Sequence, residues 1–195
     1  MSKNLIGHLN VKRNNELRFN EIKSIFDTSE SQVVDMVTNP NDICVLQTGN
    51  LLMANTTQKN LTLFDKNLNL MRTIDKFQDV AFSPSRIVCD DVDRIYIIDH
   101  SIYQVIMLDL NLNKIKCVGS KGQQADQFDL PNGIAYLSKK IYVCDTNNKR
   151  LQLLTSDLEF IGTLPLEYQP WLIKISKQKC ACISRYDKGK LFNWL

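Results

Sequence analysis

The chain has 195 residues, of which 44% are hydrophobic and 23% charged, and its formal net charge is +3. This composition is ordinary for a globular protein with a sizeable core, and the charge is too small to indicate nucleic-acid binding by itself. No apolar run approaches the roughly 20 residues that span a membrane, and the N-terminal segment MSKNLIGHLNVKRNN lacks the apolar core of a signal peptide. We therefore expect a cytoplasmic protein.

From residue 40 onward the sequence repeats a pattern of apolar runs and polar breaks. Each unit begins at a proline, followed by one apolar run and then by a second run that ends in a polar residue. The prolines are Pro40, Pro84, Pro131 and Pro170, and the second runs end at Asn55, Asp99, Asp145 and Ser184. In the first three units a third run and a turn follow, with equivalent leucines in the turns at Leu68, Leu112 and Leu158. A fourth run closes each of these units.

Apolar runs of this length, bounded by Asn, Asp, Gly and Lys, predict β-strands. Four strands in a unit of roughly 40–45 residues are typical of a propeller blade, whereas helical repeats would need a 3.6-residue periodicity that these runs lack. We therefore predict an all-β propeller of four-stranded antiparallel blades. Full blades are expected at 41–75, 86–119 and 133–165, and a partial fourth blade is expected from residue 171.

The two ends of the chain leave two architectures open. Residues 191–195 stop inside an expected third strand, and LIGHL at 5–9 resembles FIGTL, the fourth strand at 160–164. The chain is then an open fragment of a longer propeller, which we favour, or a four-bladed ring closed by its N-terminal strand. Residues 1–38 would hold that strand and a long loop, with a weakly patterned short helix at 16–26, and residues 39–195 would form the blades. A longer chain or a second copy would supply missing blades.

The segment GQQADQFDLPNGIAYLSKKIYVCDTNNKRLQLL at 122–154 resembles the NHL repeat, which ends a strand in Asp and opens the next strand with Asn and Arg. The matching positions are Gly122, Phe128, Leu130, Pro131, Gly133, Ile134, Asp145, Asn148, Arg150 and Leu151. The other units keep the proline and its spacing with less of the motif. In its overall sequence pattern the chain resembles the C-terminal NHL domain of tripartite-motif (RING/B-box) proteins. That resemblance implies a domain that selects protein or RNA partners.

The polar loops between the second and third strands of each unit hold the candidate functional residues. We expect the recurring motif positions to be structural, with aspartates that accept loop N–H groups: Asp99, Pro131, Gly133, Asp145 and Arg150. Exposed side chains of the same loops are the candidates for partner contact: Lys59, His100, Tyr103, Asn147, Asn148, Lys149, Arg185, Tyr186 and Lys188. Cations interleaved with aromatic rings suit a protein surface or single-stranded RNA.

These patterns predict a non-catalytic module that binds a protein partner, with single-stranded RNA as the alternative, and no cofactor or metal. A ubiquitin-ligase activity would need a RING pattern, which the sequence lacks. A further alternative is a propeller enzyme of the peptidyl-hydroxyglycine lyase or lactonase type. The only adjacent acids near a first strand that could serve such an enzyme are Asp90 and Asp91. The last alternative is a degenerate fragment without an independent role.

The six cysteines form no C-x-x-C pair and do not cluster with the two histidines. A zinc site needs four ligands at fixed spacing, so none is expected. We predict that the cysteines are small buried hydrophobes in a reducing compartment. Cys44, Cys89 and Cys144 in particular are expected to be buried free thiols.

Overall fold

The computed structural model describes residues 40–77, 80–175, 181–185 and 191–194, all within the unit Val37–Leu195. These residues form strands and turns, and among them we find no helix that could cross a membrane. The strand expected at 5–9 and the helix expected at 16–26 lie outside the described residues. The boundary at residue 38 and the closure of the ring by the N-terminus therefore stay predictions.

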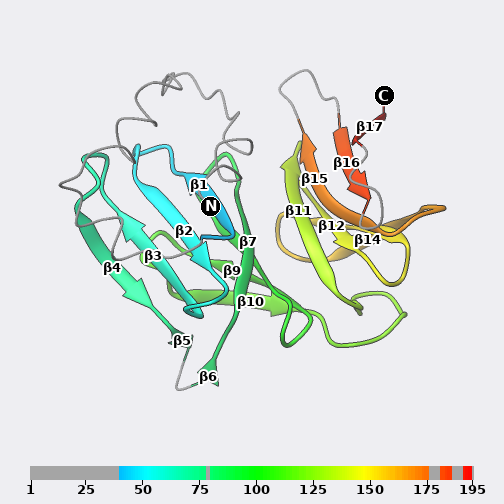
Figure 1. The fold of residues 1–195 in the computed structure, drawn as a ribbon, viewed down its shortest axis with the longest axis horizontal. Coiled ribbons are helices and arrows are strands. Elements are labelled where there is room, and N and C mark those ends of the chain that lie inside the picture. The colour runs from blue at the N-terminus through cyan, green and yellow to red at the C-terminus, as the bar shows by residue number, and fades with distance from the viewer. Residues whose placement is uncertain (1–39, 78–79, 176–180, 186–190, 195) are drawn as a thin grey trace. The chain divides into compact units, whose positions relative to one another are not determined.

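The described strands form three four-stranded antiparallel sheets and one three-stranded sheet, each in chain order (Figure 1). The first blade contains β1 (Asp42–Val45), β2 (Leu51–Asn55), β3 (Asn60–Phe64) and β4 (Leu70–Ile74). The second contains β7 (Pro84–Cys89), β8 (Ile95–Asp99), β9 (Gln104–Leu108) and β10 (Lys114–Val118). The third contains β11 (Pro131–Leu137), β12 (Lys140–Asp145), β13 (Arg150–Thr155) and β14 (Phe160–Pro165). The partial blade contains β15 (Pro170–Ile175), β16 (Ala181–Arg185) and β17 (Leu191–Trp194), and a short pair, β5 (Lys76–Phe77) with β6 (Val80–Ala81), links the first two blades.

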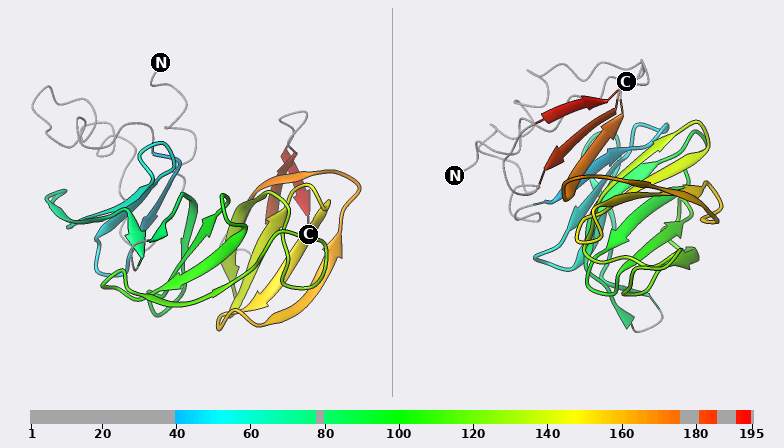
Figure 2. Two further views of the ribbon diagram at one scale, coloured as in Figure 1. Left: turned by 90° about the horizontal axis from the view of Figure 1, so that it is seen from below. Right: turned by 90° about the vertical axis from the view of Figure 1, so that its right-hand side faces the viewer.

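The predicted architecture of three full blades and a partial fourth is confirmed. The first strands of successive blades, which we call the inner strands, contact one another: β1 with β7, β7 with β11 and β11 with β15. The last strands β4, β10 and β14, which we call the outer strands, lie at the opposite edge of each sheet. Figure 2 shows the same strands from two further sides.

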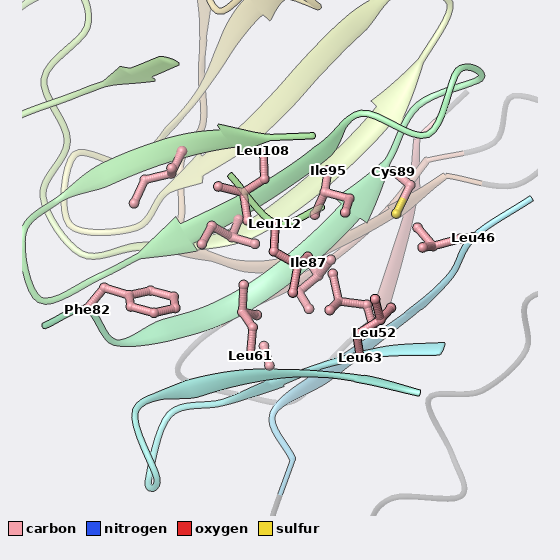
Figure 3. Close-up of a cluster of buried hydrophobic side chains, with 13 residues drawn as sticks. Leu46, Leu52, Leu61, Leu63, Phe82, Ile87, Cys89, Ile95, Leu108 and Leu112 are labelled. Carbon is pink, nitrogen blue, oxygen red and sulfur yellow. The ribbon is translucent and has the colours of Figure 1, made fainter. Parts of the chain in front are cut away.

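The hydrophobic core lies between neighbouring blades. Strand β8 is buried throughout, and its alternating side chains reach two different clusters because successive residues point to opposite faces of a sheet. Ile95 and Ile97 join the cluster shared with the first blade, whereas Tyr96 and Ile98 join the cluster shared with the third blade. Figure 3 shows the first of these clusters between the two blades. Packing on both faces explains why the second strands have almost no polar residues.

The turns between third and fourth strands are built alike in the three full blades. The first residue of each turn, Asp65, Asp109 or Thr155, accepts hydrogen bonds through its side chain from backbone N–H groups later in the turn. The equivalent leucines adopt left-handed backbone angles, with φ of 67° at Leu68, 61° at Leu112 and 57° at Leu158. Leu112 and Leu158 are buried in the clusters between blades. Their side chains therefore anchor each turn to the preceding blade.

A cation on the outer strand connects each of the first two blades to the turn of the next blade. The Arg72 guanidinium donates a hydrogen bond to the carbonyl of Asn111, and the Lys116 ammonium donates to the carbonyl of Asp157 at 2.7 Å. Gly162 occupies the same register position in the third blade, where an added Cβ would meet no atom within 4 Å. This contact therefore recurs in two blades and is absent from the third among the described residues.

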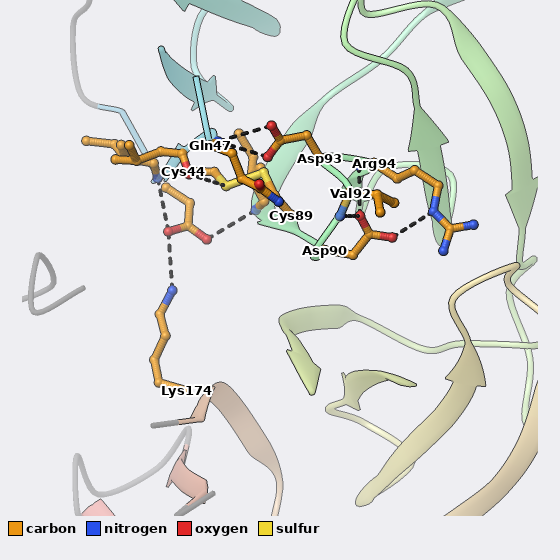
Figure 4. Close-up of a disulfide and its surroundings, with 12 residues drawn as sticks. Cys44, Gln47, Cys89, Asp90, Val92, Asp93, Arg94 and Lys174 are labelled. Atoms are coloured by element: carbon orange, nitrogen blue, oxygen red, sulfur yellow. Dashed lines mark hydrogen bonds and ion pairs between the residues drawn. A yellow bond between two sulfur atoms is a disulfide. The ribbon is translucent and has the colours of Figure 1, made fainter. Parts of the chain in front are cut away.

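The prediction of free thiols is wrong for two of the three cysteines. Cys44 of β1 and Cys89 of β7 form a disulfide, with their Cα atoms 6.7 Å apart (Figure 4). They lie 45 residues apart in the sequence but on neighbouring inner strands. A pattern within one repeat does not show that residues of two different repeats are close in space. Cys144 is free and buried, as predicted, and its burial raises the pKa of its thiol.

Candidate functional site

The polar cluster of the third blade is centred on Asp145, whose side chain is fully buried at the end of β12. Asp129 donates its backbone N–H to Asp145 Oδ1 at 2.7 Å. The Arg150 Nε group donates to Asp145 Oδ2 at 2.7 Å, and the side-chain amides of Asn148 and Gln152 complete the set at 2.9–3.3 Å. A buried carboxylate is stable only with such partners. The Asp145 carboxylate is therefore bound by donors of the protein itself.

Arg150 also attaches the segment before the blade to β13. Its Nη groups donate to the backbone carbonyls of Gln123, Gln124 and Gln127 at 2.8–2.9 Å. The guanidinium is a planar group with five N–H donors, so one side chain can bind a carboxylate and several carbonyls together. Asp145 and Arg150 thus form hydrogen bonds with the protein's own backbone.

The second blade places Asp99 at the equivalent strand end with a different set of partners. Asp99 is fully buried and accepts hydrogen bonds from the backbone N–H of Ser83 at 2.9 Å and of Ser101 at 2.9 Å. The first blade has Asn55 there, also buried, with its amide donating to Gln58 at 2.7 Å. The position recurs with the strand geometry, whereas the arginine is present in the third blade alone among the described blades.

The tips of the loops between second and third strands share one backbone conformation. Lys59, Tyr103 and Lys149 stand at equivalent positions with φ of 54°, 60° and 52°. Lys59 and Lys149 are exposed, while Tyr103 is half-buried and has the Lys121 ammonium 5.4 Å from its ring centroid. A repeated turn thus presents a side chain at the same place in three successive blades.

The remaining residues predicted for partner contact divide into three groups. Asn147 is exposed, and its amide donates to Asp129 Oδ1 at 3.1 Å. His100 and Asn148 are half-buried, and the Asn148 amide also donates to the carbonyl of Gly122, so Asn148 differs from the exposed residue that we expected. The side chain of Arg185, and Tyr186 and Lys188 altogether, lie outside the described residues.

Sequence reasoning missed the threonines that follow the strand-end position. The hydroxyl of Thr56 donates to the carbonyl of Pro84 at 2.8 Å, and that of Thr146 donates to the carbonyl of Pro170 at 2.7 Å. Each bond joins a blade to the proline that opens the next blade. His100 occupies this position in the second blade. A threonine at the same place in two units was the signal that could have identified this contact.

A second polar cluster lies at the other end of the strands, around Asp90. The Arg94 Nε group donates to Asp90 Oδ2 at 2.7 Å, and the Tyr96 hydroxyl lies 3.0 Å from the same oxygen and 2.6 Å from the carbonyl of Ser156. Arg94 also pairs with Asp157 of the third blade at 2.6 Å. Asp90, one of the two adjacent acids considered for a propeller enzyme, is therefore already bound by cationic and hydroxyl donors.

The charges of this cluster shift the pKa values of its members. Burial acts to raise the pKa of Asp90, but the hydrogen bonds from Arg94, Val92 and Tyr96 outweigh it, so that the pKa lies below its ordinary value. Burial, together with the neighbouring Asp90 carboxylate, raises the pKa of Tyr96. Among the described residues, no group of three or more His, Cys, Asp or Glu side chains is arranged to hold a metal ion.

Comparison with known families locates the motif. Residues 128–152 match the family model of the NHL repeat. The NHL repeat therefore includes Asp145, Asn148 and Arg150, which form the buried cluster. No match to the chain was found among curated proteins.

Solved structures resemble the chain in fold. Virginiamycin B lyase from Staphylococcus aureus has a TM-score of 0.62 at 12% identity over 80% of this chain and 55% of its own. A streptogramin B lyase gives 0.62 at 15% identity, with 80% and 54% covered, and the Pan2 WD40 domain of Neurospora crassa gives 0.57 at 12%, with 87% and 53% covered. The chain thus spans about half the length of these proteins, and the NHL repeat lies in a propeller-like fragment.

Proposed function

We propose that this chain is a non-catalytic module that binds a protein partner through the tips of the loops between second and third strands. One observation carries the proposal: three loops hold their tips in the same left-handed conformation, at Lys59, Tyr103 and Lys149. The polar groups buried beneath two of the tips, Asp99 and Asp145, are bound by the protein itself. The side chains left for contact are those at the tips.

The chemistry of the tips supports a protein partner over single-stranded RNA. RNA recognition of this kind depends on rings on which successive bases stack. Tyr103 is the one aromatic residue among the described tips, and the Lys121 ammonium already lies over its ring. Exposed lysines at Lys59 and Lys149, together with the exposed Ile102, offer the mixed charged and apolar contacts found in protein interfaces.

The relation to the C-terminal domains of tripartite-motif proteins is part of this proposal and rests on the motif residues quoted above. In that family the NHL domain selects the partner, and ubiquitin transfer belongs to a RING. A ligase role would therefore need a RING domain outside this sequence. The likeness to lyases, at 12–15% identity, is a likeness of fold and transfers no reaction. We also propose that the protein works without a cofactor.

Site-specific photocrosslinking tests the proposal. Benzoylphenylalanine placed at Lys59 or Lys149 should give a protein adduct in cells that naturally make the chain. Lys139 is a matched control, because it is exposed with a φ of 61° but lies in the turn at the opposite end of β12. Protein adducts at both tips and none at position 139 support the proposal. Equal adducts at all three positions, no adduct at either tip, or an adduct that ribonuclease removes would contradict it.

A further inference from the structure

The disulfide of Cys44 with Cys89 joins two inner strands that belong to different sheets. Cys89 is the last residue of β7, and Cys44 is paired with the second residue of β2. Both cysteines therefore lie toward the turns between first and second strands and away from the loop tips. We call these turns the first-blade turn, at 46–50, and the second-blade turn, at 90–94. Figure 4 shows the disulfide beside residues of both turns.

Other contacts hold the two blades together without the sulfur atoms. Buried leucine, isoleucine and phenylalanine side chains of both blades share one core cluster. The backbone N–H of Ile87 donates to Asp42 Oδ2 at 3.1 Å, and the hydroxyl of Thr56 donates to the carbonyl of Pro84 at 2.8 Å. The blades therefore stay joined when the disulfide opens, so that opening is a local change from which the protein can return.

The disulfide acts on a hydrogen-bonded junction between the two turns. The backbone N–H of Gln47, three residues after Cys44, donates to both carboxylate oxygens of Asp93, at 2.9 and 3.1 Å, and the Gln47 side-chain amide donates to the carbonyl of Asp91. Asp93 is 6% exposed and has a left-handed φ of 60°. Within the described part of the chain no other group donates to the Asp93 carboxylate. A buried carboxylate needs its donors, so this junction depends on where the first-blade turn is held.

The burial of the two sulfur-bearing residues sets the order of thiol–disulfide exchange. Cys89 is 3% exposed and Cys44 is half-buried, so a thiolate from solution reaches Cys44 first. Its sulfur bonds to Cys44 Sγ, the disulfide breaks, and Cys89 leaves as a thiolate that takes up a proton. A second thiolate attacks the external sulfur of the mixed disulfide, which releases Cys44 as a thiolate and yields an oxidised external disulfide. The reduced Cys89 is accommodated as a small apolar side chain in the core cluster.

We propose that the Cys44–Cys89 disulfide is a reversible redox latch, opened and closed by a small-molecule thiol–disulfide couple. Closed, it fixes the first-blade turn against the second-blade turn; open, it releases the junction at Asp93 while the blades remain packed. Cys117 and Cys144 are free thiols, which is unlike a framework of structural disulfides and agrees with a bond that exchanges. The latch lies away from the loop tips, so the inference does not depend on the proposed function.

Redox equilibration and hydrogen–deuterium exchange with the full chain test this inference. The native protein is equilibrated with mixtures of reduced and oxidised glutathione and quenched with acid, and alkylation with mass spectrometry shows whether Cys44 and Cys89 are linked or free. We expect the linked fraction to rise and fall reversibly with the glutathione ratio, without denaturant. At short labelling times, reduction should raise amide exchange by about tenfold or more in the two turns and leave the third-blade tip at 146–149 unchanged.

Matched variants separate the latch from the other thiols. Cys44→Ser/Cys89→Ser should exchange like the reduced protein at every glutathione ratio, whereas Cys117→Ser should keep the redox response of the parent, because Cys117 is free. Cys44→Ala alone serves if the double variant does not melt cooperatively. Three results would each overturn the proposal: linkage that no glutathione mixture changes in the native protein, the same exchange of the two turns in both redox states, or an equal rise in exchange at 146–149.

Discussion

Arg150 Nε lies 2.7 Å from Asp145 Oδ2, and the two residues face each other in the register of β12 and β13. Asp145 is fully buried and the Arg150 side chain is 15% exposed. The pair closes the loop between the two strands at its base, while Lys149 at the tip is exposed. The densest polar cluster of the sequence is thus divided between a buried ion pair and an exposed tip, and the two parts should respond differently to mutation.

Arg150→Ala should lower the free energy of unfolding by roughly 3 kcal/mol, because it leaves the buried Asp145 carboxylate without its cation and removes one donor from each of three backbone carbonyls. Lys149→Ala, one residue earlier and exposed, should change it by less than about 0.5 kcal/mol. Urea unfolding of both variants measures the difference. Equal stability of the two variants would show that the ion pair does not support the loop.

Gly133→Ala should destabilise the chain by about 1–3 kcal/mol through overpacking. An added Cβ would lie 2.7 Å from Cys144 Sγ and 2.9 Å from the backbone nitrogen of Ile173 in the partial blade, and backbone atoms cannot move aside cheaply. Gly162→Ala is the matched control, because its Cβ would meet nothing within 4 Å. Thermal melting compares the two variants. If Gly133→Ala melts with the parent, the close approach of β11 and β15 is not required.

The stability of the fold should depend on Asp90 at low pH. Because the pKa of Asp90 is lower in the folded state, its contribution is fully present above the unfolded value of about 3.9 and is lost as pH falls through the folded pKa. Asp90→Asn should reduce stability by about 2 kcal/mol at neutral pH, since the charge-assisted bond from Arg94 is lost.

Below about pH 4 the stability of Asp90→Asn should fall less steeply than that of the parent. Asp65 and Asp109 also have lowered pKa values and are present in both proteins, so the difference between the two curves reports on Asp90. Urea unfolding across the acidic range measures it. Parallel curves for parent and variant would argue against ionised Asp90 as a stabilising group.

Peptide mapping without reductant should recover Cys44 and Cys89 in one linked peptide. In the native protein, alkylation should leave Cys144 unmodified, because the thiol is buried and its raised pKa disfavours the reactive thiolate. Reduction should lower the free energy of unfolding by about 3 kcal/mol, as expected for a link between distant residues. Native labelling of Cys44 before reduction would contradict the disulfide.

Much of the fold was accessible from the sequence because its signals are local. Strand bounds followed from apolar runs and polar breaks. The blades observed at 42–74, 84–118 and 131–165, and the strands of the partial blade at 170–175, 181–185 and 191–194, match those expected. The equivalence of Leu68, Leu112 and Leu158 was also visible, since each turn is built from residues within a few positions of one another. Of the candidate site, the loops of the three full blades were located correctly, but the hydrogen bonds that Asn148 makes to Asp145 beneath the tip were not predicted.

The sequence by itself determined the repeat, the strand periodicity and the loops at which side chains are presented. Tertiary structure alone decided which distant residues meet: the disulfide of Cys44 with Cys89 and the bond of Arg72 to Asn111. The reason is physical. Strands and turns form from interactions among near neighbours in the chain, whereas contacts between blades depend on how one sheet stacks on the next, and a repeating pattern is the same whatever that stacking is.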